Sequence, residues 1–151
     1  FILIIGIRNE DRDKLNKLKQ TVKGYPIEII ENPPNKILWE KYSKAKIYWH
    51  ATGFGEDLQK HPEKAEHFGI STVEAMGMGV VPVVINEGGQ KEIVTDGKNG
   101  FFWDTIDELQ IKTKKLIDNK KLLNDMAEQA RMRAKDFSNA KFCQKIRQLI
   151  E

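Results

Sequence analysis

Short apolar runs alternate with amphipathic stretches along the first two thirds of the chain. The apolar runs predict strands at 1–7, 26–30, 46–51, 80–85 and 100–103. The stretches between them have apolar residues at helical spacing and predict helices at about 9–22, 37–45, 68–78 and 88–94. Strands separated by helices are typical of parallel sheets with right-handed crossovers. The pattern therefore predicts an α/β fold, a Rossmann-like doubly wound parallel sheet with its ligand site at the carboxyl ends of the strands.

Three elements of this pattern make specific structural predictions. The all-apolar run Phe1–Ile7 predicts a strand that is buried on both faces, and Asn9 is the expected N-cap of the helix that follows. After Trp103 the apolar positions predict three consecutive C-terminal helices. A buried strand rarely starts at a free terminus, so we expect that further structure precedes Phe1 in the natural protein.

Composition limits the classes of protein that this chain can represent. Its 151 residues indicate one domain, 1–151, and the single Cys143 excludes a disulfide framework and favours a reducing, cytoplasmic location. Lysines interleave with acidic residues, and the net charge is only +3, so we expect solvated helix faces and no nucleic-acid partner. The three histidines and one cysteine have no metal-site spacing, and no apolar run is long enough to span a membrane.

The loop after the third predicted strand carries the clearest candidate chemistry. The irregular stretch 52–67 is long enough to be a lid or binding loop. It ends at Glu66, just before a helix start, and Glu74 stands about two turns into that helix. The free N–H groups of 68–71 and the positive end of the helix dipole predict an anion site suited to a diphosphate.

Carboxylates beside a diphosphate are favourable only if they accept hydrogen bonds from neutral hydroxyl groups. A nucleotide sugar offers such hydroxyls on both sides of its diphosphate, so Glu66 and Glu74 predict this class of ligand. The alternative is structural: Glu66 caps the helix and Glu74 lies on its solvent face. Gly88-Gly89, at the next helix start, is explained equally by a ligand or by a turn that needs positive φ.

Several motifs in order carry a family resemblance. They are Glu66-His67-Phe68-Gly69-Ile70-Ser71-Thr72-Val73-Glu74, Gly79-Val80-Val81-Pro82-Val83-Val84, and Gly88-Gly89-Gln90-Lys91-Glu92-Ile93-Val94. Together they closely resemble the C-terminal donor-binding domain of retaining GT-B glycosyltransferases of family 4. The resemblance extends with lower specificity from Phe1 to about Trp103. The 66–70 run is also similar to eukaryotic mannosyltransferases of lipid-linked oligosaccharide assembly.

The resemblance implies a role for each matching residue. Glu66 would contact hydroxyls of the transferred hexose as the catalytic carboxylate, and Glu74 would hold the ribose. The residues implied in donor binding besides Glu74 are His67, Phe68, Gly69, Ile70, Ser71, Gly88, Gly89 and Gln90. No metal and no cofactor are implied, because backbone N–H groups and basic side chains neutralise the diphosphate.

In this family the basic residues that face the diphosphate, and an entire acceptor domain, precede the segment that matches Phe1. We therefore expect half of an enzyme, which is inactive alone. The acceptor, a saccharide or a lipid-linked saccharide, and any membrane contact at the inner face would involve the missing half. The implied activity is transfer of a hexose, with mannose the indicated sugar, with retention of configuration.

Other classes of function fit the pattern to different degrees. A nucleotide-sugar isomerase or epimerase of GT-B architecture shares the diphosphate chemistry, and a non-catalytic nucleotide-sugar-binding module would keep the fold. A response-regulator switch needs an acidic cluster after the first strand, where this chain has Arg8-Asn9. Asp11-Arg12-Asp13 matches a metal-binding string but lies in a first helical turn, where acids favour the dipole. Of the histidines near the site, His67 is favoured over His50 as a phosphate contact.

Overall fold

The computed structural model describes residues 1–150. The chain divides into two compact units, Phe1–Lys41 and the part from Tyr42 onward. The boundary falls inside a helix, α2 (Asn35–Lys44).

The first unit is built on two parallel strands, β1 (Ile2–Ile5) and β2 (Glu28–Glu31). A 3-10 turn, η1 (Asn9–Asp11), and the helix α1 (Arg12–Thr21) connect them. The prediction that Asn9 caps this helix is wrong. The N–H of Asp11 donates to the carbonyl of Arg8 and closes the 3-10 turn, so α1 begins only at Arg12.

The prediction that the first strand is buried on both faces is also wrong. Phe1, Ile2 and Leu3 are exposed, because β1 pairs with β2 alone in a two-stranded sheet. Such a sheet leaves much of its surface uncovered.

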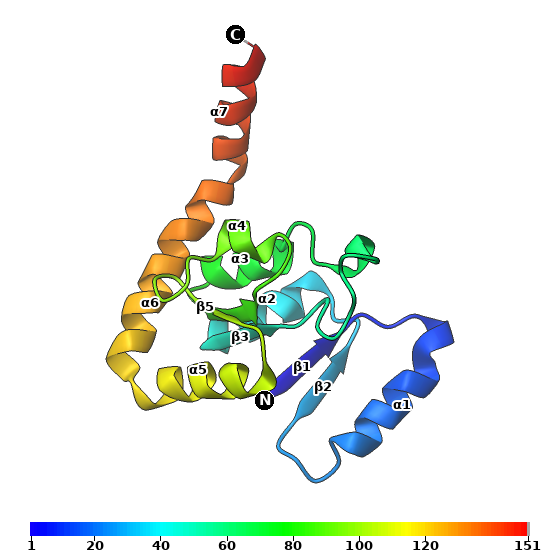
Figure 1. Cartoon of the computed structure of the whole chain (residues 1–151). Coiled ribbons are helices and arrows are strands. Elements are labelled where there is room, and N and C mark those ends of the chain that lie inside the picture. The colour runs from blue at the N-terminus through cyan, green and yellow to red at the C-terminus, as the bar shows by residue number, and fades with distance from the viewer. Residues whose placement is uncertain (151) are drawn as a thin grey trace. The chain divides into compact units, whose positions relative to one another are not determined.

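The second unit has a three-stranded parallel sheet at its centre (Figure 1), and its strands pair in the order β3-β4-β5. The strands are β3 (Ile47–His50), β4 (Val81–Ile85) and β5 (Phe101–Trp103). Every residue of the central strand β4 is buried, as expected for a β-branched run covered on both faces. All strand pairings of both units are parallel, as predicted.

Helices cover both faces of this sheet and make two cores. On one face, Leu116 of α5 (Ile106–Asp118) and Met126 of α6 (Lys120–Ala134) pack on Val83 and Trp103. On the other face, Met76 packs with Val84 and Ile93. Met76 belongs to α3 (Ile70–Gly77) and Ile93 to the short helix α4 (Gln90–Ile93).

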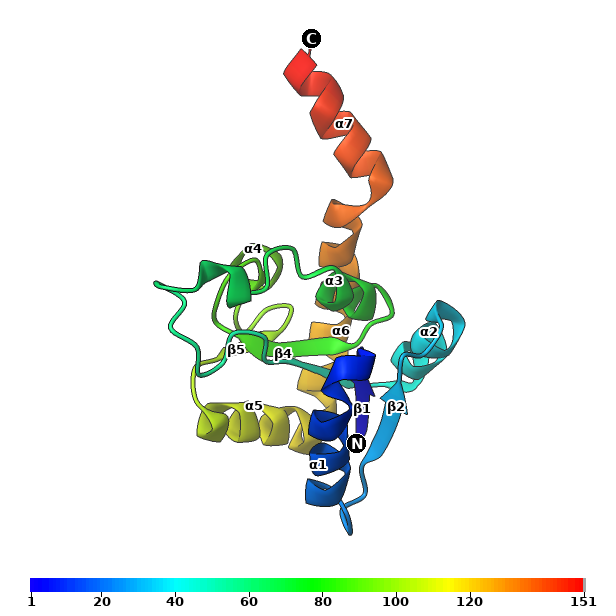
Figure 2. The ribbon, with the colours of Figure 1, turned by 90° about the vertical axis from the view of Figure 1, so that its right-hand side faces the viewer.

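The C-terminal helix of this unit leaves its apolar residues uncovered. After a 3-10 turn, η3 (Lys135–Phe137), the helix α7 (Asn139–Ile150) extends away from the sheet (Figure 2). No residue of α7 is buried, and the expected apolar stripe of Phe142, Ile146 and Leu149 is exposed. Within residues 1–150, no helix is both long and apolar enough to cross a membrane.

Candidate functional site

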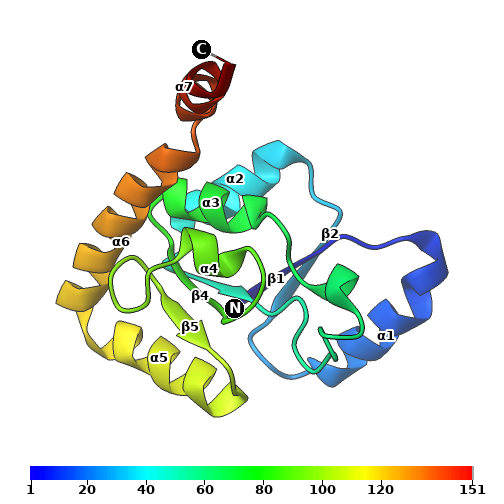
Figure 3. The same ribbon diagram turned by 45° about the horizontal axis from the view of Figure 1, so that its top comes forward.

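The carboxyl ends of β3 and β4 bring the two predicted motifs together. β3 ends at His50, and the loop that follows, with one 3-10 turn, η2 (Pro62–Lys64), leads to Glu66 and α3. β4 leads through Gly88-Gly89 into α4. Figure 3 shows α3 and α4 side by side above the sheet. Residues about twenty positions apart in the sequence therefore share one end of the sheet.

The carboxylate of Glu66 lies across the start of α3. Its Oε1 accepts hydrogen bonds from the N–H groups of Phe68 (3.2 Å) and Gly69 (3.1 Å). Its Oε2 lies 3.2 Å from Nε2 of His50. Burial alone would raise the pKa of Glu66, but the hydrogen bonds from Gly69, Phe68 and His50 outweigh it and hold the pKa below its ordinary value. Glu66 is therefore a fixed, ionised carboxylate.

The sequence left open a purely structural role, in which Glu66 caps the helix and Glu74 lies on its solvent face. Both of these features are present: Glu66 caps α3, and Glu74 is exposed on that helix. It also divides the predicted anion site. The N–H groups of Phe68 and Gly69 are taken by Glu66, whereas no described residue accepts a hydrogen bond from the N–H groups of Ile70 and Ser71. The free donors thus begin at Ile70, the first residue of α3, two residues after the start of the predicted 68–71 segment.

The remaining side chains at this helix start differ in exposure. His67 and Glu74 are exposed, and Phe68 and Ile70 are 79% and 67% exposed. The Ser71 hydroxyl is instead tied to the sheet, with its Oγ 2.8 Å from the hydroxyl of Tyr48. Phe68 and Ile70 are thus large, exposed apolar side chains next to free N–H groups. Exposed apolar surface of this kind is typical of a place where a ligand binds.

Gly88 and Gly89 lie against the backbone of the Glu66 loop. A Cβ on Gly88 would lie 2.3 Å from the carbonyl oxygen of Glu66, and a Cβ on Gly89 would lie 2.3 Å from that of His67. Gly88 also has φ = 55°, in the left-handed region. Both positions must therefore be glycine, because the backbone of the Glu66 loop comes too close for a Cβ. From the sequence alone, a ligand and a turn were equally good explanations of these two glycines.

Gln90, predicted to line the sugar, is fully buried. Its amide nitrogen and oxygen have no hydrogen-bond partner among the described residues, and they lie below Gly69 at the start of α3. In this structure Gln90 supports the site from beneath and has no exposed surface for a ligand.

The carboxyl ends of β1 and β2 are linked within the first unit. Asn32, with φ = 43°, accepts a 2.8 Å hydrogen bond from the N–H of Ile7 and donates one of 3.0 Å to its carbonyl. The carboxylate of Glu31 pairs with Arg12 and Lys19 of α1. Glu31 is thus occupied by partners of its own unit.

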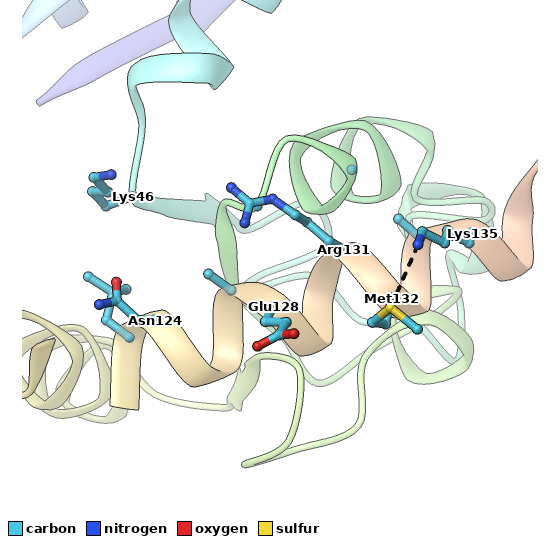
Figure 4. Close-up of a pocket in the computed structure, with 11 residues that line it drawn as sticks. Lys46, Asn124, Glu128, Arg131, Met132 and Lys135 are labelled. Atoms are coloured by element: carbon cyan, nitrogen blue, oxygen red, sulfur yellow. Dashed lines mark hydrogen bonds between the residues drawn. The ribbon is translucent and has the colours of Figure 1, made fainter. Parts of the chain in front are cut away.

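Two cavities of the second unit were not predicted from the sequence. One of about 380 Å³ is lined by 53–59 of the long loop, with Ile85, Glu87 and Asp104 from the carboxyl ends of β4 and β5. Only the length of the 52–67 loop pointed to it. Another, of about 750 Å³, lies between the end of α3 and α6, and Lys46, Glu128, Arg131 and Lys135 are among its lining residues (Figure 4). Lys46 and Gly79 precede β3 and β4, so this second cavity is at the opposite end of the strands from Glu66.

Residues 1–150 contain no group of three or more His, Cys, Asp or Glu side chains placed to hold a metal ion. Asp11 of the metal-like string instead forms an ion pair with Lys14, 2.6 Å away, within the first helical turns.

Comparison with known proteins shows the family to which this chain belongs. Residues 1–133 match the model of the glycosyl transferases group 1, and the chain belongs to that family. Over 161 aligned residues that cover the whole chain, it is 29% identical to a GDP-Man:Man(3)GlcNAc(2)-PP-Dol alpha-1,2-mannosyltransferase of Dictyostelium discoideum. It is 34% identical over 71% of its length to the mannosyltransferase of the same name from Xenopus laevis. The chain spans only 29% and 21% of the lengths of these two relatives.

Solved structures confirm the predicted fold class. HepE of Anabaena in complex with UDP superposes with a TM-score of 0.79 and 19% identity, over 99% of this chain and 40% of that one. The C-terminal domain of a glycosyl transferase group 1 protein, LpcC of Francisella tularensis, superposes with a TM-score of 0.67 and 22% identity, over 89% of this chain and 83% of that one. At these identities the likeness establishes the α/β, GT-B-type fold.

Proposed function

We propose that residues 1–151 form the donor-binding domain of a retaining glycosyltransferase that uses a nucleotide diphosphate sugar. The observation that carries this proposal is the anchored carboxylate of Glu66 beside the free N–H groups of Ile70 and Ser71. It offers a hydroxyl acceptor and an anion site within one helix start. Membership of the group 1 glycosyl transferases supports the reaction class.

The diphosphate would bind at the start of α3. The N–H groups of Ile70 and Ser71 and the positive end of the helix dipole stabilise its negative charge, which is largest when the nucleoside diphosphate departs. Phe68 and Gly69 serve this site by holding Glu66 in place. Basic side chains from outside this segment complete the neutralisation of the diphosphate charge, without a metal ion.

The two carboxylates would then face opposite ends of the donor. Glu74, exposed on α3, accepts hydrogen bonds from the ribose hydroxyls. Glu66 accepts from hydroxyls of the hexose, where its charge also stabilises the positive charge that develops at the anomeric carbon. The exposed His67 lies at the phosphate, and Gly88, Gly89 and Gln90 form the sugar-side wall and its support.

Mannose is the hexose that we propose, because the relatives from Dictyostelium and Xenopus are named as GDP-Man-dependent mannosyltransferases. Both names also describe an acceptor joined to PP-Dol, so we propose a saccharide or lipid-linked saccharide acceptor at the cytoplasmic side. The acceptor would bind to a further domain of the natural protein.

A donor assay of the natural full-length protein tests this function. It is incubated with GDP-mannose or UDP-glucose and a lipid extract of its source, and the released nucleoside diphosphate and the anomeric configuration of the product are measured. The proposal predicts release of GDP and an α-mannoside. Conversion of the donor into an isomer would indicate an epimerase, and binding without turnover would indicate a non-catalytic module.

Residues 1–151 alone should fold and bind UDP or GDP weakly, with no transfer activity, because half of the cleft is absent. Titration calorimetry of this segment measures the affinity. Sub-micromolar binding or turnover would show that the domain boundary is misplaced.

A further inference from the structure

The histidine that contacts Glu66 is His50, whereas the sequence pattern favoured the neighbouring His67. His50 is the last residue of β3 and only 8% exposed, and its Nε2 lies 3.2 Å from Oε2 of Glu66. His67 is exposed, and its ring lies 6.4 Å from that of Phe68. The sheet therefore supplies a partner to the carboxylate from 16 residues away in the sequence.

The surroundings of His50 fix the direction of this hydrogen bond. An ionised carboxylate only accepts, so Nε2 of His50 carries the proton and donates it to Glu66. The other ring nitrogen, Nδ1, is buried and has no partner among the described residues. An N–H at Nδ1 would face no acceptor, which favours the tautomer with the proton on Nε2.

The hydrogen bonds of Glu66 leave part of its carboxylate open. A carboxylate has about four acceptor positions. Phe68 and Gly69 take two at Oε1, and His50 takes one at Oε2. About a quarter of the Glu66 side chain is exposed, and one acceptor position of Oε2 has no partner among the described residues.

We propose that His50 is a positioning residue: its Nε2–H holds the Glu66 carboxylate so that the free acceptor position faces a hydroxyl of the donor sugar. This inference rests on the proposed function and assigns no direct contact between His50 and the donor. The two N–H groups of the loop hold only Oε1, and without His50 the carboxylate could rotate about that oxygen. Three donors from two separate elements fix both its position and its plane.

A set of variants of the full-length protein tests this role. His50→Leu removes the donor, His50→Gln keeps an amide N–H near the position of Nε2, and Glu66→Ala removes the carboxylate. Turnover and inhibition by the nucleoside diphosphate are measured for each, and for the double variant His50→Leu/Glu66→Ala. Melting temperatures show which variants are folded at the assay temperature.

We expect His50→Leu to lower turnover at least about tenfold, the effect of one lost hydrogen bond to a charged group. The inhibition constant of the nucleotide should change less than about twofold, and His50→Gln should recover most of the turnover. In the Glu66→Ala background, His50→Leu should have almost no further effect, because its role passes through Glu66. Equal losses in the Leu and Gln variants, or an additive loss in the double variant, would overturn the positioning role.

A spectroscopic measurement tests the inference without any activity. In a sample with ¹⁵N-labelled histidine, the ring of His50 should show a protonated Nε2 and an unprotonated Nδ1, and Glu66→Ala should shift the Nε2 signal. A ring without a proton on Nε2 would overturn the positioning role and leave the proposed function untouched. Wild-type turnover in Glu66→Ala alone would instead overturn the site assignment of the proposed function.

Discussion

The N–H of Gly89 donates a 2.7 Å hydrogen bond to the carbonyl oxygen of Glu66. This bond joins the loop after β3 to the loop after β4, so the two motifs that the sequence separates form one structural unit. Gly89 thus helps to position Glu66 through the backbone of that residue, without a contact to its carboxylate.

Gly89→Ala tests this close approach. Gly89 has φ = −63°, which any residue adopts, so the substitution adds only a Cβ that would lie 2.3 Å from the carbonyl oxygen of His67. We expect a loss of about 1–3 kcal/mol in unfolding free energy from this overpacking, together with reduced donor binding. Urea unfolding and titration with the nucleotide measure both.

Gly77→Ala is the matched control. Gly77 ends α3, and a Cβ there would meet only the Cβ of Ala134 at 4.0 Å. Because alanine favours a helix over glycine, this variant should be as stable as the wild type or up to about 1 kcal/mol more stable. A loss in Gly77→Ala as large as that in Gly89→Ala would contradict the role of close approach.

The two carboxylates of the proposed site should have separable effects. Glu74→Ala should mainly weaken nucleotide binding, because ribose contacts are equal in the ground and transition states. Glu66→Ala should mainly lower turnover, because its contacts strengthen as charge develops on the sugar. Each lost hydrogen bond should cost about 1.5–3 kcal/mol, measured by steady-state kinetics of the full-length protein. Unchanged turnover in Glu66→Ala would remove this residue from the site.

The lowered pKa of Glu66 predicts a dependence of stability on pH. A carboxylate with a depressed folded-state pKa stabilises the fold above its ordinary value near 4.5, and this stabilisation is lost as the pH falls through the lowered pKa. The difference in unfolding free energy between the wild type and Glu66→Gln should therefore be largest at neutral pH and shrink in acid. Thermal unfolding over a pH series measures this difference.

Glu128→Gln controls for the change in net charge, because it removes an exposed carboxylate from α6. A difference between wild type and Glu66→Gln that grows as the pH falls would show that the hydrogen bonds at Glu66 do not favour its ionised form.

The account also predicts activity without a divalent metal. The donor diphosphate is neutralised by N–H groups, the dipole of α3 and basic side chains, so transfer by the full-length protein should survive EDTA. Asp11→Ala with Asp13→Ala should change the rate less than about threefold, as for surface substitutions. A strict divalent-ion requirement that is lost in this double variant would contradict the proposed site.

The sequence predicted the parts of this structure that local patterns determine. The run Val81–Ile85 forms a strand as predicted, and the motif from Glu66 to Glu74 leads into a helix at the end of a parallel strand. The edge strand β1 was predicted as buried from its apolar run, and its first residues are exposed; the apolar stripe expected on α7 is present but exposed. Apolar periodicity shows which face of a helix or strand is apolar. It does not show whether another part of the described chain covers that face.

Contacts that join distant segments were beyond the sequence pattern. The local pattern around His50 does not predict that its ring reaches Glu66, because that contact depends on the path of the whole loop 51–65. The glycines at 88 and 89 were visible, but their cause was not, since a backbone approach to Glu66 and His67 exists only in the folded chain. A histidine at the end of a strand that precedes such a loop is the signal that could have pointed to the pair.

A structure of the full-length protein with a bound, non-transferable nucleotide sugar tests the central claim most directly. We expect the diphosphate at the N–H groups of Ile70 and Ser71, the ribose hydroxyls at Glu74, and a hexose hydroxyl at the free acceptor position of Glu66. A nucleotide bound elsewhere, such as in the cavity beside Arg131 and Lys135, with the start of α3 empty, would contradict it.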